Sequence, residues 1–198
     1  MVVLIGGGAL LDMPTINEQI VAKLDNIRNV QLRKPVILFL PQASSESKPY
    51  VNSFYKEFGS RLKCKATCAL WRKAEMSREH IADKFAKCDA VYIGGGRYDV
   101  LERAFKEMDV LPLLKDCYEQ GKLIVGNSAG AMILCKNSIS DYKKEIEPNG
   151  DYEVVNGSGI VNVNLCPHAN EIDRQKYMLK HNLANYVYLK EKEILIQD

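Results

Sequence analysis

The stretch KLIVGNSAGAMILC, residues 122–135, decides the fold of this chain. A short apolar run ends at Gly126, Ser128 follows among small residues, and an apolar segment with helical spacing begins at once. Residues 126–130 therefore satisfy the pattern G-x-S-x-G between a predicted strand and a predicted helix, the context of a nucleophile elbow. The two glycines allow a tight turn that holds the serine hydroxyl exposed. A serine that only caps the helix is the alternative interpretation.

The chain on the amino-terminal side of this stretch repeats the same alternation. The segments expected to be strands are apolar throughout, and those expected to be helices have apolar residues at helical spacing. The expected strands lie at 2–8, 35–41, 62–70, 90–96 and 122–126, and the expected helices at 14–27, 50–58, 77–88, 99–108, 112–120 and after Ser128. Strands of this kind, separated by amphipathic helices, indicate a parallel sheet covered on both faces. The sequence predicts an α/β fold, a three-layer α/β/α sandwich with a mostly parallel central sheet.

Beyond Ser140 the pattern changes. Residues 141–155 are charged and rich in turn residues, 158–168 read as a strand that runs into a loop, and 171–181 read as a helix. Short apolar segments at 185–189 and 193–197 are expected to add edge strands. With 198 residues, 46% of them hydrophobic, the chain is expected to form one globular domain over 1–198.

Charge and the amino-terminal sequence exclude several classes of partner. The net charge of +2 is spread evenly, so no basic stripe suits a nucleic acid, and small neutral or mildly acidic ligands fit better. The apolar start MVVLIGGG has no preceding basic region and is too short for a signal peptide or a membrane span. We therefore expect a cytoplasmic protein with no nucleic-acid or membrane partner.

Six cysteines are scattered through apparent core segments, so disulfides are not expected. Cys64 and Cys68 lie close together, but no second pair and no nearby histidine pair completes a zinc site. The sequence therefore predicts no metal and no cofactor.

A serine nucleophile needs a base, and the chain has three histidines. His80 lies inside a charged amphipathic helix, and His181 ends a helix, where a cation is favoured by the dipole. His168 differs, because it follows a strand and a proline in a loop. Ligands bind at the carboxyl ends of strands in open α/β sheets, so His168 is the candidate general base beside Ser128.

The third member of such a triad is a carboxylate that orients the imidazole. Asp141, Glu145 and Glu147 all lie between Ser128 and His168 in the sequence, and spacing alone does not choose among them. A charge run of this kind is also typical of a solvated surface.

Several segments together carry a family resemblance. LIGGG near the start, PQAS after the second expected strand, YIGGGRYDVL, the elbow GNSAGAMILC and CPHANEIDRQ occur in an order that resembles the peptidase E family of serine peptidases. That family comprises α-aspartyl dipeptidases, to which cyanophycinases are related. The resemblance covers most of the chain and implies a fold similar to class I glutamine amidotransferases, with serine in place of their elbow cysteine.

The resemblance also implies site roles. It places the nucleophile at Ser128, the histidine at His168 and the acid most closely at Asp141, while the cyanophycinase branch keeps Glu145 and Glu147 open. The backbone N–H of Gly95 or Gly96 would join that of Ala129, the first residue of the elbow helix, in an oxyanion hole.

A dipeptide with an N-terminal aspartate is the substrate that the resemblance implies, and such a substrate needs a cation, preferably an arginine. Arg174 is the main candidate and Arg97, beside the glycines, the other. A hydrolase of other short peptides or amides is an alternative, as is a catalytically silent module that binds a small molecule or a partner. Glutamine amidotransfer is excluded, because that reaction uses a thiolate and no cysteine occupies the elbow. The C-terminal segment could leave a sheet edge that a homodimer would cover.

Overall fold

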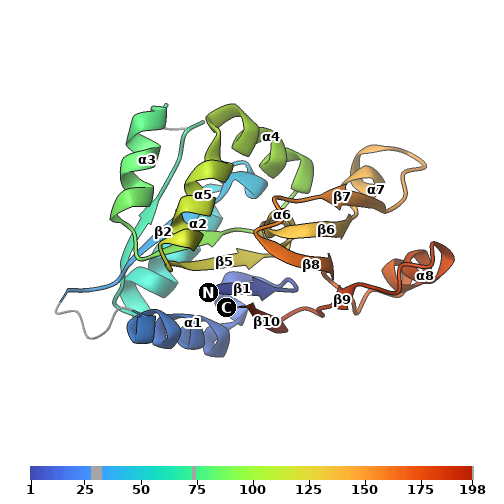
Figure 1. Ribbon diagram of the computed structural model, residues 1–198, viewed down its shortest axis with the longest axis horizontal. Coiled ribbons are helices and arrows are strands. Elements are labelled where there is room, and N and C mark those ends of the chain that lie inside the picture. Colours follow the sequence, from blue (N-terminus) through green and yellow to red (C-terminus); the bar gives the residue numbers. More distant parts are fainter. Residues whose placement is uncertain (28–32, 73–74, 198) are drawn as a thin grey trace.

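The computed structural model describes residues 1–27, 33–72 and 75–197. Its main sheet has six strands in the order β10-β1-β5-β4-β2-β3. All neighbours are parallel except β10, which runs antiparallel to β1 and brings the two ends of the chain side by side (Figure 1). The strands are β1 (Val2–Ile5), β2 (Val36–Leu40), β3 (Lys65–Cys68), β4 (Ala90–Ile93), β5 (Leu123–Asn127) and β10 (Ile194–Gln197).

Helices cover both faces of this sheet, as the apolar strands predict. Val3 and Ile5 of β1 belong to one core, whereas Val2 and Leu4 belong to the other, because successive side chains point to opposite faces. The first core includes α1 (Pro14–Ile27) and α2 (Lys48–Phe54), which continues as a π-helix (Tyr55–Arg61). The second includes α3 (Arg78–Lys87), α4 (Tyr98–Met108), α5 (Val110–Glu119) and α6 (Ala129–Leu134). The three-layer α/β/α fold is therefore confirmed.

A second sheet differs from the expectation for the region after the elbow. The elbow helix α6 has only six residues, and β6 (Cys135–Ser140) follows it directly. The order of this sheet is β7-β6-β8-β9. Its other strands are β7 (Glu153–Asn156), β8 (Val161–Cys166) and β9 (Val187–Tyr188), with α7 (Tyr142–Ile146) and α8 (Ile172–Lys180) in the connections. Of the two expected edge strands, β10 joins the main sheet and β9 joins this one.

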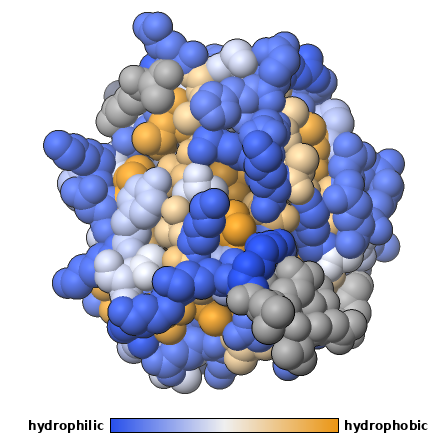
Figure 2. Space-filling view, turned by 90° about the vertical axis from the view of Figure 1, so that its left-hand side faces the viewer, coloured by the Kyte–Doolittle hydropathy of each residue, from blue (hydrophilic) through white to orange (hydrophobic). Residues whose placement is uncertain are grey.

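The five parallel strands of the main sheet run from left to right in Figure 1, so their carboxyl ends face the second sheet and α8, whereas β10 runs back toward the left. Two short 3₁₀ turns, Leu10–Asp12 and Gln42–Ser44, follow β1 and β2 at these ends. The opposite end of the molecule, turned toward the viewer in Figure 2, is hydrophilic over most of its visible surface, with hydrophobic residues showing between the polar ones. In an open α/β sheet the chemistry lies at the carboxyl ends, on the side away from this view.

Candidate active site

Ser128 lies at a strained turn between β5 and α6. Its backbone has φ 50° and ψ −113°, a conformation that L residues rarely adopt and that costs about 1–3 kcal/mol. The turn is closely packed. A Cβ on Gly126 would lie 2.3 Å from the carbonyl oxygen of Gly130, and one on Gly130 would lie 2.2 Å from that of Ile93. Only glycine fits at both positions, so the G-x-S-x-G pattern is a packing requirement of this elbow.

His168 reaches the elbow from the second sheet. It follows β8 with φ 49°, and its backbone N–H donates to the carbonyl of Gly6 at 2.9 Å. The imidazole packs on Gly7, where a Cβ would lie 2.2 Å from His168 Cε1. This placement brings His168 Nε2 to 2.8 Å from Ser128 Oγ. The structure thus brings together the serine and the histidine that the sequence singles out.

The carboxylate that faces the histidine is Glu191, which the sequence analysis did not consider. Its Oε1 lies 3.4 Å from His168 Nδ1, and its side chain is 49% exposed. Glu191 lies in the turn before β10, which is held by a bond from Lys192 N–H to the carbonyl of Gly7. Of the expected acids, Asp141 pairs with Arg174 instead, and Glu145 lines the cavity described below without an ion pair to a described residue.

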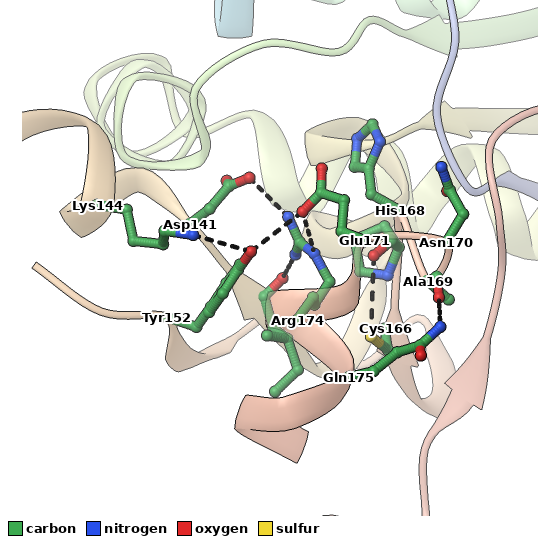
Figure 3. Close-up of polar contacts among 12 residues, drawn as sticks. Asp141, Lys144, Tyr152, Cys166, His168, Ala169, Asn170, Glu171, Arg174 and Gln175 are labelled. Carbon is green, nitrogen blue, oxygen red and sulfur yellow. Dashed lines mark hydrogen bonds and ion pairs between the residues drawn. The ribbon is translucent and has the colours of Figure 1, made fainter. Parts of the chain in front are cut away.

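Arg174 is fully buried and its guanidinium is held from several sides (Figure 3). Nη2 donates to Asp141 at 2.6 Å, Nε to Glu171 at 3.2 Å and Nη1 to the carbonyl of Ile139 at 2.8 Å. The guanidinium carbon lies 4.8 Å from the centre of the Tyr152 ring, and the Tyr152 hydroxyl donates to Glu171. Arg174 is therefore enclosed by partners and does not line the cavity beside Ser128.

The candidate oxyanion donors lie around Ser128. Ala129 begins α6, so its N–H is one of the first four in the helix, which have no intrahelical acceptor. Gly95 lies against the serine, since a Cβ there would be 3.3 Å from Ser128 Cβ, and its N–H donates to the hydroxyl of Tyr50 at 3.3 Å. Burial raises the pKa of Tyr50, which keeps this hydroxyl protonated. Gly96 has φ 138° and packs against Ala43, leaving no room for a side chain.

These residues surround a cavity of about 750 Å³, within the usual range for small-molecule sites. Ser128, His168, Gly95 and Gly96 all line it. Its charged lining consists of five carboxylates and one guanidinium: Asp12, Asp141, Glu145, Glu171, Glu191 and Arg97. Arg97 donates to Asp99 through Nε at 3.0 Å and Nη2 at 2.7 Å. The cavity therefore joins a nucleophile and a base to a wall that is mainly anionic.

The remaining candidates lie elsewhere. His80 is exposed on α3, and the His181 ring lies 4.4 Å from that of Tyr177 at the end of α8. All six cysteines are buried free thiols, Cys64 and Cys68 among them. Within the described ranges, no group of three or more histidine, cysteine, aspartate or glutamate side chains could hold a metal ion, and no helix is long and apolar enough to cross a membrane.

Comparisons with known proteins show which fold and family this chain shares. Among solved structures, a candidate peptidase E protein from Listeria monocytogenes EGD-e superposes with a TM-score of 0.70 at 20% identity, covering 98% of this chain and 91% of that one. A peptidase from an acI-B1 Actinobacterium gives 0.67 at 22% identity, covering 99% and 82%. Both likenesses show the fold.

Sequence relatives include three uncharacterized peptidases. YgaJ of Bacillus subtilis is 28% identical over 72% of this chain, and the match spans 58% of YgaJ. Lin0382 of Listeria innocua is 26% identical over 83% of this chain and 85% of its own length. PM1590 of Pasteurella multocida is 32% identical over 63% of this chain and 58% of its own. The model of peptidase family S51 matches residues 2–196, and the chain therefore belongs to this family, the peptidase E family.

Proposed function

We propose that the chain hydrolyses short peptides by a serine mechanism, with Ser128 as nucleophile and His168 as general base. The observation that carries the proposal is the 2.8 Å separation of Ser128 Oγ and His168 Nε2 at the carboxyl end of the sheet. A base must lie within about 2.6–3.2 Å of the heavy atom that carries the proton it removes. The strained elbow also holds the serine oxygen beside the cavity.

The reaction follows from these positions. His168 Nε2 takes the proton of Ser128 Oγ as the oxygen attacks the peptide carbonyl, and the oxyanion is stabilised by the N–H groups of Ala129 and of Gly95 or Gly96. Gly95 would exchange its long bond to Tyr50 for the oxyanion. The imidazolium then returns the proton to the leaving amine, and water hydrolyses the acyl-enzyme.

Glu191 serves in this proposal as the carboxylate that orients the imidazole. Before the transfer, Nε2 must be unprotonated to accept the serine proton, so the neutral ring carries its proton on Nδ1, which faces Glu191 Oε1. Asp141, the acid implied by the family resemblance, is bonded to Arg174 and not to the imidazole. The alternative of a silent binding module is disfavoured, since its expected mark is a histidine turned away from the serine with no carboxylate behind it.

An N-terminal aspartate as substrate remains a prediction from the resemblance. Its expected anchor, Arg174, is fully buried among its own partners, and Arg97 is paired with Asp99. The proposal made from geometry is therefore limited to short peptides. A homodimer likewise remains a prediction; β10 does form one edge of the main sheet, and light scattering on the purified protein would measure the mass.

Hydrolysis of Ala-Leu and Asp-Leu by the wild type, Ser128→Ala and Ser53→Ala tests the function. Ser53 is a matched control, because it is another serine that lines the same cavity. We expect Ser128→Ala to lose at least about a thousandfold in kcat/KM for any dipeptide that is cleaved. Ser53→Ala should stay within about threefold of the wild type. Equal hydrolysis by the wild type and Ser128→Ala would overturn the proposal.

A further inference from the structure

The cavity beside Ser128 is rich in groups that accept hydrogen bonds and poor in free cations. Asp12 and Glu145 form no ion pair with any described residue. The Glu191 carboxylate faces the imidazole of His168 and forms no other ion pair with a described residue. Lys192 lies near Gly8 but lines a neighbouring cavity, together with Asp12. A ligand with a negative side chain would therefore meet mostly like charge.

Two of the carboxylates are held in place by the buried Arg174. Asp141 accepts through Oδ2, and Glu171 through Oε2 from both Arg174 and Tyr152. The second oxygen of each accepts no hydrogen bond from the described residues, and Figure 3 shows that of Glu171 pointing away from Arg174. Lys144 is a second cation beside this pair, since its Nζ donates to the Tyr152 hydroxyl at 3.1 Å, so Asp12 and Glu145 carry most of the uncompensated charge of the cavity. Fixed acceptors of this kind bind a cation without first having to be ordered.

Asn127 adds an independent observation. It lines the same cavity with only 2% of its surface exposed, and its Nδ2 donates to the carbonyl of Gly8 at 3.1 Å. Its Oδ1 is buried and has no hydrogen-bond partner among the described residues. A buried acceptor without a donor is destabilising, and an N–H group that reached it would remove that penalty. The lining of the cavity therefore offers acceptors on Asn127 and on the carboxylates, which suits a ligand with hydrogen-bond donors.

We propose that the substrate is a short peptide with a positively charged residue beside the scissile bond, and that acidic residues there are disfavoured. The inference rests on the proposed peptidase function. It reverses the charge preference that the family resemblance implies. Asp12, Glu145 and the pair Asp141 and Glu171 supply the anionic wall, and Asn127 Oδ1 accepts from a substrate N–H.

The test compares dipeptides that differ only in charge. Lysine is paired with norleucine and aspartate with asparagine, in each case before leucine and after it, and kcat/KM is measured for the eight dipeptides. We expect the lysine peptide to exceed its norleucine partner by about tenfold or more in at least one position, from two or more partly exposed charge pairs. Aspartate should be slower than asparagine in both positions. In 1 M NaCl, where the Debye length is about 3 Å, both ratios should shrink toward one.

Two variants locate the preference. Asp12→Asn and Glu145→Gln each remove one unpaired carboxylate from the wall, and each should lower the lysine-to-norleucine ratio by about two- to fivefold. Glu119→Gln is the matched control, because Glu119 is exposed on α5 and does not line the cavity. It should leave the ratio unchanged.

Binding to Ser128→Ala, measured by calorimetry with the same peptides, separates this proposal from the proposed function. If the wild type cleaves none of the peptides, the proposed function fails, and the ratio of Kd values still decides the charge preference. Tighter binding of the lysine peptides supports the inference. Faster cleavage or tighter binding of aspartate than of asparagine, or equal values for lysine and norleucine, would overturn it.

Discussion

Replacing Arg174 with methionine should lower the stability of the protein, and any effect on acidic substrates should be secondary. Methionine is also a long, unbranched side chain, so it fills much of the space that the arginine stem occupies. What is lost is the guanidinium, with its bonds to Asp141, Glu171 and the carbonyl of Ile139. The fully buried position makes this loss a property of the fold.

The size of the effect follows from the exposure of the partners. Removing one member of a buried ion pair costs about 3–5 kcal/mol. The side chains of Asp141 and Glu171 are 41% and 42% exposed, so water solvates them once the guanidinium is gone. The expected loss is then about 2–3 kcal/mol. For a chain of this length each kcal/mol lowers Tm by about 2–4 °C, so Tm should fall by about 4–12 °C.

Thermal unfolding followed by circular dichroism measures this change, with Arg103→Met as the matched control. Arg103 is 61% exposed and lies 4.0 Å from Asp99, so its variant should unfold within about 2 °C of the wild type. If Arg174→Met keeps the wild-type Tm but raises KM for Asp-Leu and leaves KM for Asn-Leu unchanged, the reasoning is refuted. Arg174 would then be the substrate anchor that the family resemblance implies.

Three further predictions concern the site and the core. Gly7→Ala would place a Cβ 2.2 Å from His168 Cε1 and displace the imidazole, so we expect peptide hydrolysis to fall by at least about a hundredfold. Gly59→Ala is the control and should retain activity, because its Cβ would lie 3.6 Å from the nearest atom, an ordinary contact. Glu191→Gln should lower kcat by about ten- to a hundredfold. This is less than the roughly 10⁴-fold loss on replacing a buried triad acid, because the Glu191 side chain is half exposed. An unchanged kcat would show that Glu191 does not orient the imidazole. None of the six cysteines should react quickly with Ellman's reagent at pH 8 in the native state, because all of them are buried. Burial also raises the pKa of Cys166 to about 11, whereas the hydrogen bond with Cys88 lowers the pKa of Cys117, which burial alone protects. Rapid reaction without denaturant would contradict this.

The main sheet could be predicted because most of its strands are short, apolar and separated by amphipathic helices, with β3 as the polar exception at one edge. The second sheet could not. β6 begins directly after a six-residue helix, and its residues CKNSIS carry neither a clear alternation nor a continuous apolar run. What makes it a strand is pairing with β7 and β8, which lie later in the chain. Tertiary pairing of this kind leaves little local signal.

The residues of the candidate site also differ in how far the sequence alone predicts them. Ser128 was accessible to sequence reasoning because it follows a strand of the main sheet in the pattern of an elbow. His168 was accessible because it follows a strand and a proline in a loop, although that strand, β8, belongs to the second sheet. Glu191 was not, because it lies in the charged turn KEKE, and its approach to the imidazole depends on how that turn docks on Gly7. The burial of Arg174 could have been predicted from its spacing. Arg174 lies four residues before the apolar Met178, and both are buried on the same face of α8.

Labelling with a fluorophosphonate, located by mass spectrometry of the digested protein, tests the central claim most directly. The claim is that His168 activates Ser128, so we predict one adduct, on the peptide that contains Ser128, and labelling of His168→Gln slower by at least about a hundredfold. Circular dichroism of both proteins establishes that they are folded. No adduct on Ser128 in the folded wild type, or labelling at the same rate in His168→Gln, would contradict the account.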